Sequence, residues 1–307
     1  MSRLTVANSL SLSGSEVRAG WVARVADYVE LTKPRIVMLE LVTVVVAAHL
    51  ASPWGIQAAV LMHTVIGAGL VAASAGAFNQ WWEQTTDAQM KRTACRPLPA
   101  GRLGAWQVVM FGAVTLLVGL IQLRIEVTET TAVVALATWA IYVLVYTPLK
   151  TRSPLNTAVG AVSGSLPILI GWTATGAPID TRALALLGVM FLWQFPHFMA
   201  IAWLYRFEYA RAGQRMLTVV DPTGLRAGAQ AVVGALALVP VSLLLAVSPD
   251  AGSPIIYCTW ALVLGAMLVA AAVMFLIYPD DRAARRLLRA SLVYLICWMG
   301  LLLMVAV

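Results

Sequence analysis

Long apolar runs recur from one end of the chain to the other, and no other feature of the sequence constrains the fold as strongly. Each run holds about 20 residues, the length that an α-helix needs to cross the hydrocarbon core of a bilayer. Backbone polar groups inside a bilayer must pair within the protein, so spanning segments form helices or closed barrels. A barrel would show short segments of alternating polarity, whereas these runs are long and unbroken. An all-α integral membrane protein is therefore predicted.

Polar connections divide the apolar sequence into nine predicted spans. Composition agrees with this class, because 11% of the residues are charged, whereas a soluble domain has roughly 25%. Residues 1–30 are predicted to form a polar tail without a secretory signal peptide, and residues 31–307 a single membrane-embedded domain. The predicted spans are Arg35–Leu50, Ala58–Trp82, Ala105–Leu123, Thr130–Leu149, Asn156–Thr175, Ala183–Tyr205, Ala227–Val247, Pro254–Tyr278 and Ala290–Val307.

Cations are distributed unevenly between the two sides of the predicted bundle. All but two of the 21 Lys and Arg residues fall in the amino-terminal tail or in every second connection, and the exceptions are Arg124 and Arg182. Because cytoplasmic loops carry the excess of cations, the tail and the long loops are predicted to be cytoplasmic. This segregation explains the net charge of +7 without a nucleic-acid partner. We predict a multi-pass protein of a bacterial cytoplasmic (inner) membrane, with its amino terminus in the cytoplasm.

Three oxygen-bearing side chains follow one another at the end of the second predicted span, in the stretch "NQWWEQTTDAQMKRTACRP". Asn79, Glu83 and Asp87 are spaced four residues apart, so on a helix they share one face. Carboxylate oxygens at this spacing suit Mg²⁺, which takes one or two protein carboxylates and completes its shell with water and substrate phosphates. Carboxylates at a membrane boundary are costly, and such residues usually have a function. The alternative is a helix end with solvated charges.

Three cations come directly after these acids: Lys91, Arg92 and Arg96. Such cations can contact phosphate oxygens, and Arg can do so with two parallel hydrogen bonds. Acids alone would repel a diphosphate, and cations alone would not select one that carries a metal. The combination predicts a site for a diphosphate held through Mg²⁺. The alternative function for the cations is to set the topology.

A second acid-bearing segment, "YRFEY", ends the sixth predicted span and contains Arg206, Glu208 and Tyr209. Like the first segment it begins a basic loop, which suggests two similar half-sites that face one cytoplasmic cavity. The alternative is an interfacial aromatic belt with one ion pair. His197 lies a turn or two earlier in "LWQFPHFMA", where it is either a packing residue or part of the site.

The sequence resembles the UbiA-type intramembrane prenyltransferases over most of the chain from the first to the seventh span. The similar stretches are "LTKPRIVML", "NQWWEQTTDAQMKRTACRPLP", "YTPLKTRSPLNTAVGAVSGSLPILIGW", "LWQFPHFMAIAW" and "EYARAGQRML". The first acid motif is shared across this superfamily, whereas "MKRTACRPLP", the Lys150–Trp172 block and "PHF" are similar to its haem-modifying branch. The resemblance implies about nine helices around a central cavity that opens at the cytoplasmic side.

The activity implied by this resemblance is transfer of a farnesyl group from farnesyl diphosphate to the 2-vinyl group of haem b. The product, haem O, serves the assembly of terminal oxidases, and Mg²⁺ is the implied cofactor. A haem A synthase or a second copy of the chain is the implied protein partner. The implied catalytic residues are Asn79, Glu83, Asp87 and Glu208, of which the three acids bind the metal. The implied substrate-binding residues are Lys33, Arg35, Lys91, Arg92, Arg96, Lys150, Asn156, His197, Arg206 and Tyr209.

Aromatic residues near the first motif, Trp81 and Trp82, and also Tyr209 are candidates to stabilise an allylic cation by cation–π contact. His197 is a candidate axial ligand or polar anchor for the haem. The sequence departs from the family pattern at Glu83, where Asp is usual, and at Phe207, where a polar or acidic residue is usual. It also has Gln214-Arg215 in place of Ile-Pro.

Two other functions are compatible with parts of the sequence. A prenyltransferase for an aromatic acid or a quinone precursor would share the acid motifs but would not need the Lys150–Trp172 block. A transporter or channel would need polar residues spread through its spans, whereas here they gather at one predicted membrane face.

Overall fold

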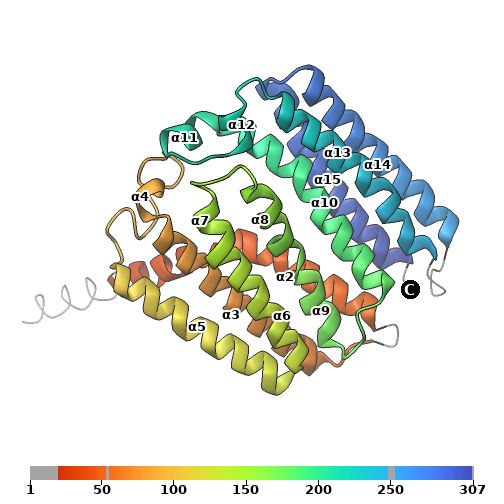
Figure 1. Cartoon of the computed structure of the whole chain (residues 1–307). Coiled ribbons are helices and arrows are strands. Elements are labelled where there is room, and N and C mark those ends of the chain that lie inside the picture. Colours follow the sequence, from red (N-terminus) through yellow and green to blue (C-terminus); the bar gives the residue numbers. More distant parts are fainter. Residues whose placement is uncertain (1–19, 53–54, 248–252, 306–307) are drawn as a thin grey trace, which may run out of the picture.

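A computed structural model describes residues 20–52, 55–247 and 253–305 of the chain (Figure 1). Within these ranges there is no strand, and nine helical segments are long and apolar enough to cross a membrane. The predicted all-α membrane fold with about nine spans is confirmed for these residues. The spans are α2 (Pro34–Ala51), α3 (Ala58–Trp82), α5 (Ala105–Glu126), α6 (Glu129–Ala140) with η1 (Ile141–Tyr146) and α7 (Thr147–Leu149), α8 (Asn156–Ser165) with α9 (Pro167–Ala174), α10 (Thr181–Leu204), α13 (Leu225–Leu243) with η2 (Leu244–Val247), α14 (Pro254–Ile277) and α15 (Asp281–Val305).

The predicted span boundaries agree with these helices to within a few residues, except at the start of the ninth. The α15 helix begins at Asp281, nine residues before the predicted start at Ala290, so that boundary was wrong. The segment between Asp281 and Ala290 contains four arginines and is helical. Charged side chains lower the hydropathy of a segment, but they do not interrupt a helix. The Asp280 carboxylate also accepts a hydrogen bond from the backbone N–H of Ala283 (2.7 Å), which caps the new helix end. The predicted end at Val307 and residues 1–19 of the predicted tail lie outside the described residues.

The spans form a bundle in which α8 and α9 lie between two groups of helices (Figure 1). The α2, α3, α5 and α6 helices form one group, and the α10, α13, α14 and α15 helices form the other. The first group contacts the intervening pair where α2 packs against α9, so closely that a Cβ on Gly171 would lie 2.0 Å from the carbonyl oxygen of Val44. Glycine is required at this contact because no other residue leaves room for the backbone of α2.

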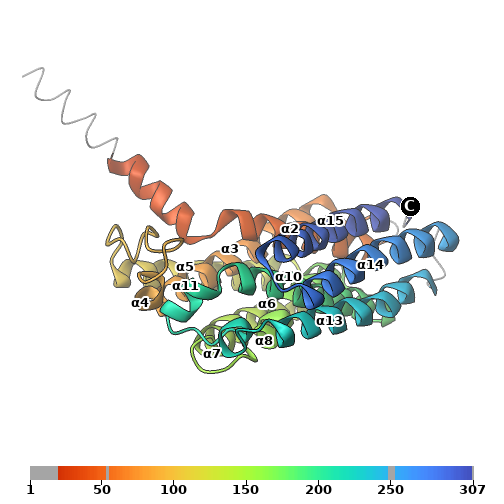
Figure 2. The same cartoon turned by 90° about the horizontal axis from the view of Figure 1, so that it is seen from above.

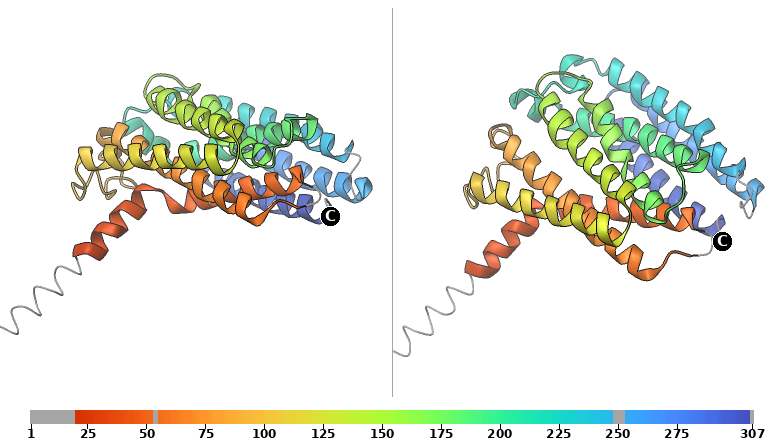
Figure 3. Two further views of the ribbon diagram at one scale, coloured as in Figure 1. Left: turned by 90° about the horizontal axis from the view of Figure 1, so that it is seen from below. Right: turned by 60° about the horizontal axis from the view of Figure 1, so that its bottom comes forward.

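Three short helices lie together at one end of the bundle, opposite the carboxyl-terminal end of α15 (Figures 1 and 2). They are α4 (Gln84–Asp87), α11 (Arg206–Arg211) and α12 (Leu217–Val220). A helical segment of residues 20–31 projects from the same end (Figure 3). It is held there by Arg102, which pairs with Asp27 and Glu30. The two predicted acid motifs and the long basic loops are thereby gathered at one end.

Two proline residues interrupt spans, and one of them, Pro148, lies near this end. Pro148 cannot donate to the helix, and the preceding residues form the π-helical segment η1, in which the N–H of Thr147 donates to the carbonyl of Tyr142. Pro167 separates α8 from α9. Thr147 and Lys150, which follow η1, contact side chains at the end of α3.

Candidate active site

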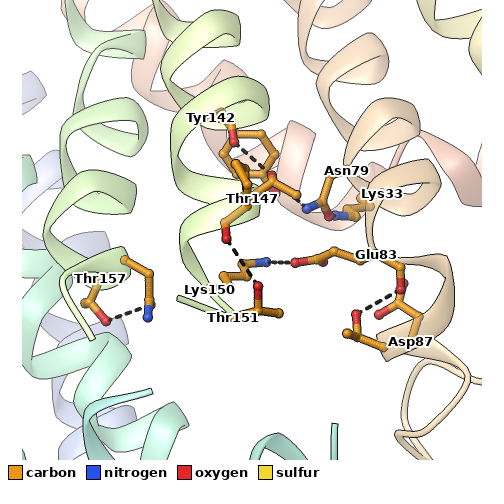
Figure 4. Close-up of polar contacts among 12 residues, drawn as sticks. Lys33, Asn79, Glu83, Asp87, Tyr142, Thr147, Lys150, Thr151 and Thr157 are labelled. Atoms are coloured by element: carbon orange, nitrogen blue, oxygen red, sulfur yellow. Dashed lines mark hydrogen bonds and ion pairs between the residues drawn. The ribbon is translucent and has the colours of Figure 1, made fainter. Parts of the chain in front are cut away.

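The acids of the first motif lie on one continuous side of the α3–α4 segment. Although α3 ends at Trp82, the backbone N–H of Glu83 donates to Asn79 (2.9 Å) and that of Asp87 donates to Glu83 (2.7 Å). The four-residue spacing is therefore maintained through the junction. Figure 4 shows Asn79 and Glu83 pointing across to the segment that ends at Lys150. All three oxygen-bearing side chains are buried, so the alternative of solvated helix-end charges does not fit.

Each buried acid of this motif is paired with one cation. The Nζ of Lys150 lies 2.8 Å from Oε1 of Glu83, and an Arg96 guanidinium nitrogen lies 2.6 Å from Oδ2 of Asp87. Burial raises the pKa of Asp87, although the Arg96 charge acts in the opposite direction. Burial alone would lower the pKa of Lys150, but the adjacent Glu83 carboxylate outweighs this effect and raises it. The acids and cations thus form two charge-balanced pairs.

A third cation reaches this cluster from the start of α2. Lys33 donates to Oδ1 of Asn79, and the Asn79 amide donates to Oγ1 of Thr147 (3.1 Å). Burial, and then the charges of Arg96 and Lys150, lower the pKa of Lys33 to about 7. Lys33 has a left-handed backbone (φ 53°), which no other described non-glycine residue adopts. A strained backbone of this kind, at a cost of roughly 1–3 kcal/mol, is typical of functional sites.

The second acid motif lies against the loop of the first. Oε2 of Glu208 accepts a long hydrogen bond from the backbone N–H of Arg92 (3.4 Å), and the Arg92 guanidinium lies 4.8 Å from the ring centre of Tyr205. Tyr209 is buried in a cluster with Met90 from the first loop. The two predicted half-sites are therefore neighbours in space, although their residues are more than 100 positions apart.

The loop after α11 is attached to the loop before α8. The backbone N–H of Arg215 donates to the carbonyl of Lys150 (2.7 Å), and the buried Asn156 amide donates to the carbonyls of Ser153 and Arg215. Asn156 thus connects two loops around the site and does not contact the acids. Because Lys150 belongs to one of these loops, the attachment also positions its side chain beside Glu83.

Other predicted site residues lie outside this cluster. Arg206 pairs with Asp281 of α15 (2.9 Å) and lies over the rings of Trp203 and Phe207. His197 makes a 2.9 Å hydrogen bond through Nδ1 with Ser291 and stacks on the ring of Trp193. Arg35 and Lys91 are exposed.

Trp81 and Trp82 lie on the outer side of α3, where they line a shallow surface hollow. They are 38% and 45% exposed, which fits interfacial anchors better than a shelter for a cation inside the site. The aromatic rings that do contact the charged cluster were not predicted. Lys150 lies 4.6 Å from the ring centre of Tyr146, and the ring of Tyr142 lies 5.2 Å from that of Tyr146. The "YTPLK" stretch could have indicated these rings, because it places aromatic and polar residues directly before a proline and a lysine.

The donor set fits a magnesium ion shared with an anion. The described residues contain no group of three His, Cys, Asp or Glu side chains that could enclose a metal by themselves. Oδ1 of Asp87 is buried without a hydrogen-bond partner, and Glu83 is the next side chain on the same face. Mg²⁺ requires only one or two carboxylates when water and phosphate complete its shell. The neighbouring cations supply the charge that a phosphate would need.

Known proteins are similar to this chain over most of its length. Residues 41–299 match the model of the UbiA prenyltransferase family. The chain is 45% identical over 274 residues to a protoheme IX farnesyltransferase of Rhodopirellula baltica, covering 87% of this chain and 95% of that protein.

Solved structures share the fold. A digeranylgeranylglyceryl phosphate synthase has a TM-score of 0.74 at 16% identity, over 92% of this chain and 99% of that one. A UbiA homolog from Archaeoglobus fulgidus, bound to DMAPP and Mg²⁺, has a TM-score of 0.60 at 13% identity, over 87% and 98% of the two chains. The resemblance predicted from the sequence is confirmed, and the chain belongs to the UbiA prenyltransferase family.

Proposed function

We propose that this protein transfers a farnesyl group from farnesyl diphosphate to the 2-vinyl group of haem b, which gives haem O. The observation that supports prenyl transfer from a diphosphate is the pair of buried acids, Glu83 and Asp87. Each is paired with a cation at one end of an apolar bundle. The acceptor is inferred from the name of the Rhodopirellula relative, which this chain matches along nearly all of its length.

Glu83 and Asp87 would hold Mg²⁺, with Glu208 on the opposite loop as the candidate for a second ion. The metal would supply positive charge to the departing diphosphate, where negative charge develops. The family relative bound to DMAPP and Mg²⁺ supports this assignment. Lys150, Arg96 and Lys33 surround the same point and would bind the phosphate oxygens. A cation that now neutralises an acid would be free for the diphosphate once the acid takes a metal.

We also propose that the loop end of the bundle faces the cytoplasm of a bacterial inner membrane, since the excess of Lys and Arg lies at this end. Farnesyl diphosphate would enter there, and its apolar chain would extend toward the bilayer centre between the helices. A second copy of the chain or a haem A synthase is the proposed protein partner.

The proposed activity is tested by incubating membranes that contain the protein with haem b, farnesyl diphosphate and Mg²⁺, followed by mass analysis of the extracted pigments. We expect a farnesylated, hydroxylated haem. An aromatic acid in place of haem b tests the alternative acceptor. Its farnesylation with no modified haem would contradict the proposal, and absence of diphosphate release in detergent would favour a transporter.

Glu208→Gln is expected to raise the Mg²⁺ concentration that gives half-maximal transfer by ~10-fold or more, the scale of losing one group around a metal. Glu208 has no second carboxylate beside it, because Phe207 occupies the adjacent position. The measurement is a Mg²⁺ titration of the transfer rate. An unchanged titration would exclude Glu208 as a metal ligand.

Phe207→Glu provides the comparison for that titration. The Phe207 ring is 71% exposed beneath the Arg206 guanidinium, so a carboxylate there stays in water and beside a cation. We expect this variant to be tolerated and to need no more Mg²⁺ than the original protein. A damaged variant would instead indicate that Phe207 packs against the farnesyl tail or a haem edge.

His197→Ala is expected to weaken haem binding by ~10-fold and to alter the haem absorption spectrum, while the affinity for inorganic diphosphate with Mg²⁺ stays the same. Nε2 of His197 has no hydrogen-bond partner among the described residues, whereas Nδ1 is oriented by Ser291. An imidazole fixed in this way can ligate iron. Ser291→Ala, which removes only the orienting hydroxyl, is expected to have a smaller effect. An unchanged spectrum with lower thermal stability would establish a packing role.

A further inference from the structure

Glu40 is a carboxylate in the interior of a membrane span, and nothing above uses it. In the described spans the other acids lie at helix ends: Glu126, Glu129 and Asp281. Glu40 is the seventh residue of α2, about 9 Å along the helix axis from Pro34. A carboxylate at this depth is costly, and such residues usually have a function.

The side chain of Glu40 lies on the face of α2 that is directed into the bundle. It comes four residues before Val44 and seven before Ala47, which are 1% and 0% exposed, and seven residues after Lys33. The spacings to Val44 and Ala47 place these three residues on one helix face, and Lys33 lies just before the first turn of the helix. Glu40 is half-buried on this face.

The charged neighbours of Glu40 are those of the active site. The charge of Lys33 acts on the Glu40 carboxylate, and Glu40 and Glu83 both act on the phenol of Tyr142. The carboxylate itself makes no hydrogen bond and no ion pair with the described residues. It is therefore an unpartnered acid about two helical turns deeper than the contact between Lys33 and Asn79.

We propose that Glu40 accepts the proton released on the acceptor side of the reaction. The inference rests on the proposed function. Transfer forms a bond between the terminal vinyl carbon of the haem and C1 of the farnesyl group, as the bond from C1 to the diphosphate oxygen breaks. The inner vinyl carbon then carries the positive charge. Water adds to that carbon, and one of its protons must leave to give the hydroxyl group.

The position of Glu40 suits this task. With the proposed diphosphate at the loop end beside Lys33, C1 and the acceptor would lie deeper in the bundle, as Glu40 does. Lys33 and Tyr142 are the two titratable groups near it. Lys33 donates to Asn79 and is assigned to the diphosphate, and a phenol at neutral pH carries its own proton. General-base catalysis of this kind contributes typically 10²–10⁴-fold.

The test compares Glu40→Gln with Glu40→Asp, which keeps the charge, and with Glu126→Gln, the same change at a half-exposed acid at the end of α5. The readouts are kcat, KM for farnesyl diphosphate, pigment mass, and binding of inorganic diphosphate with Mg²⁺ by calorimetry. We expect Glu40→Gln to lower kcat by ~10²-fold with KM and diphosphate binding unchanged. Glu40→Asp is expected to recover at least a tenth of the rate, and Glu126→Gln to behave as the original protein.

Two results would overturn the inference. One is a Glu40→Gln protein that forms hydroxylated product at the original rate. The other is a variant that loses diphosphate binding together with turnover, which would make Glu40 structural. Failure of the proposed function looks different, because then the original protein itself forms no farnesylated haem.

Discussion

Asp87→Asn is expected to lower the rate of prenyl transfer by at least ~10²-fold, the scale of removing one charge-stabilising group from an active site. Asp87 is 1% exposed and has one oxygen on Arg96 and one without a partner. The amide keeps the shape and can still accept the hydrogen bond from Arg96, so the fold should survive. What it lacks is the negative charge that a metal requires. The measurement is the transfer rate of the purified variant at saturating Mg²⁺.

Asp180→Asn is the matched control for this change. Asp180 caps the start of α10 through a hydrogen bond from the N–H of Ala183 (3.0 Å), and Asn caps helices equally well. We expect the control to keep its activity and its Mg²⁺ dependence. Near-normal transfer by Asp87→Asn would show that the magnesium assignment is wrong.

Lys150→Met is expected to cost about 3–5 kcal/mol of folding stability and to abolish transfer, because it leaves Glu83 buried without a counter-ion. Both side chains of this pair are mostly buried, at 14% and 8% exposure, so water cannot replace the missing partner. The measurement is the fraction of protein that remains folded in detergent as temperature rises. Lys91→Met, which removes an exposed lysine, is expected to change the unfolding free energy by less than ~0.5 kcal/mol.

The double variant Glu83→Gln with Lys150→Met separates stability from catalysis. Removing both charges leaves no unpaired carboxylate at position 83, so most of the lost stability should return. Transfer should stay absent, because a metal-binding carboxylate and a phosphate-binding cation are both missing. A double variant as unstable as Lys150→Met alone would show that the ion pair is not the reason for the loss.

Local features of the sequence were sufficient to predict much of the architecture. A span is defined by a continuous run of apolar residues, and the spacing of Asn79, Glu83 and Asp87 defines a helix face regardless of what packs against it. The helix formed by each apolar run and the face shared by residues four apart both follow from hydrogen bonds between residues four apart in the chain. These bonds do not depend on tertiary packing, so both features could be predicted from the sequence. The start of α15 was missed because hydropathy measures transfer into lipid and not the ability to form a helix.

Only the tertiary structure decided which charges meet. Lys33 reaches Asn79 across 46 positions, and the partner of Arg206 is Asp281, not a residue of the charged cluster. Such pairs depend on how the helices pack and on the turn that η1 introduces before Lys150. Helix packing also determines that Trp81 lies on the outer side of α3. One face of that helix carries the site residues, and the opposite face contacts lipid. Glycine at position 171 lets α2 and α9 approach, and it is packing of this kind, rather than spacing along the chain, that brings acids and cations into one cluster.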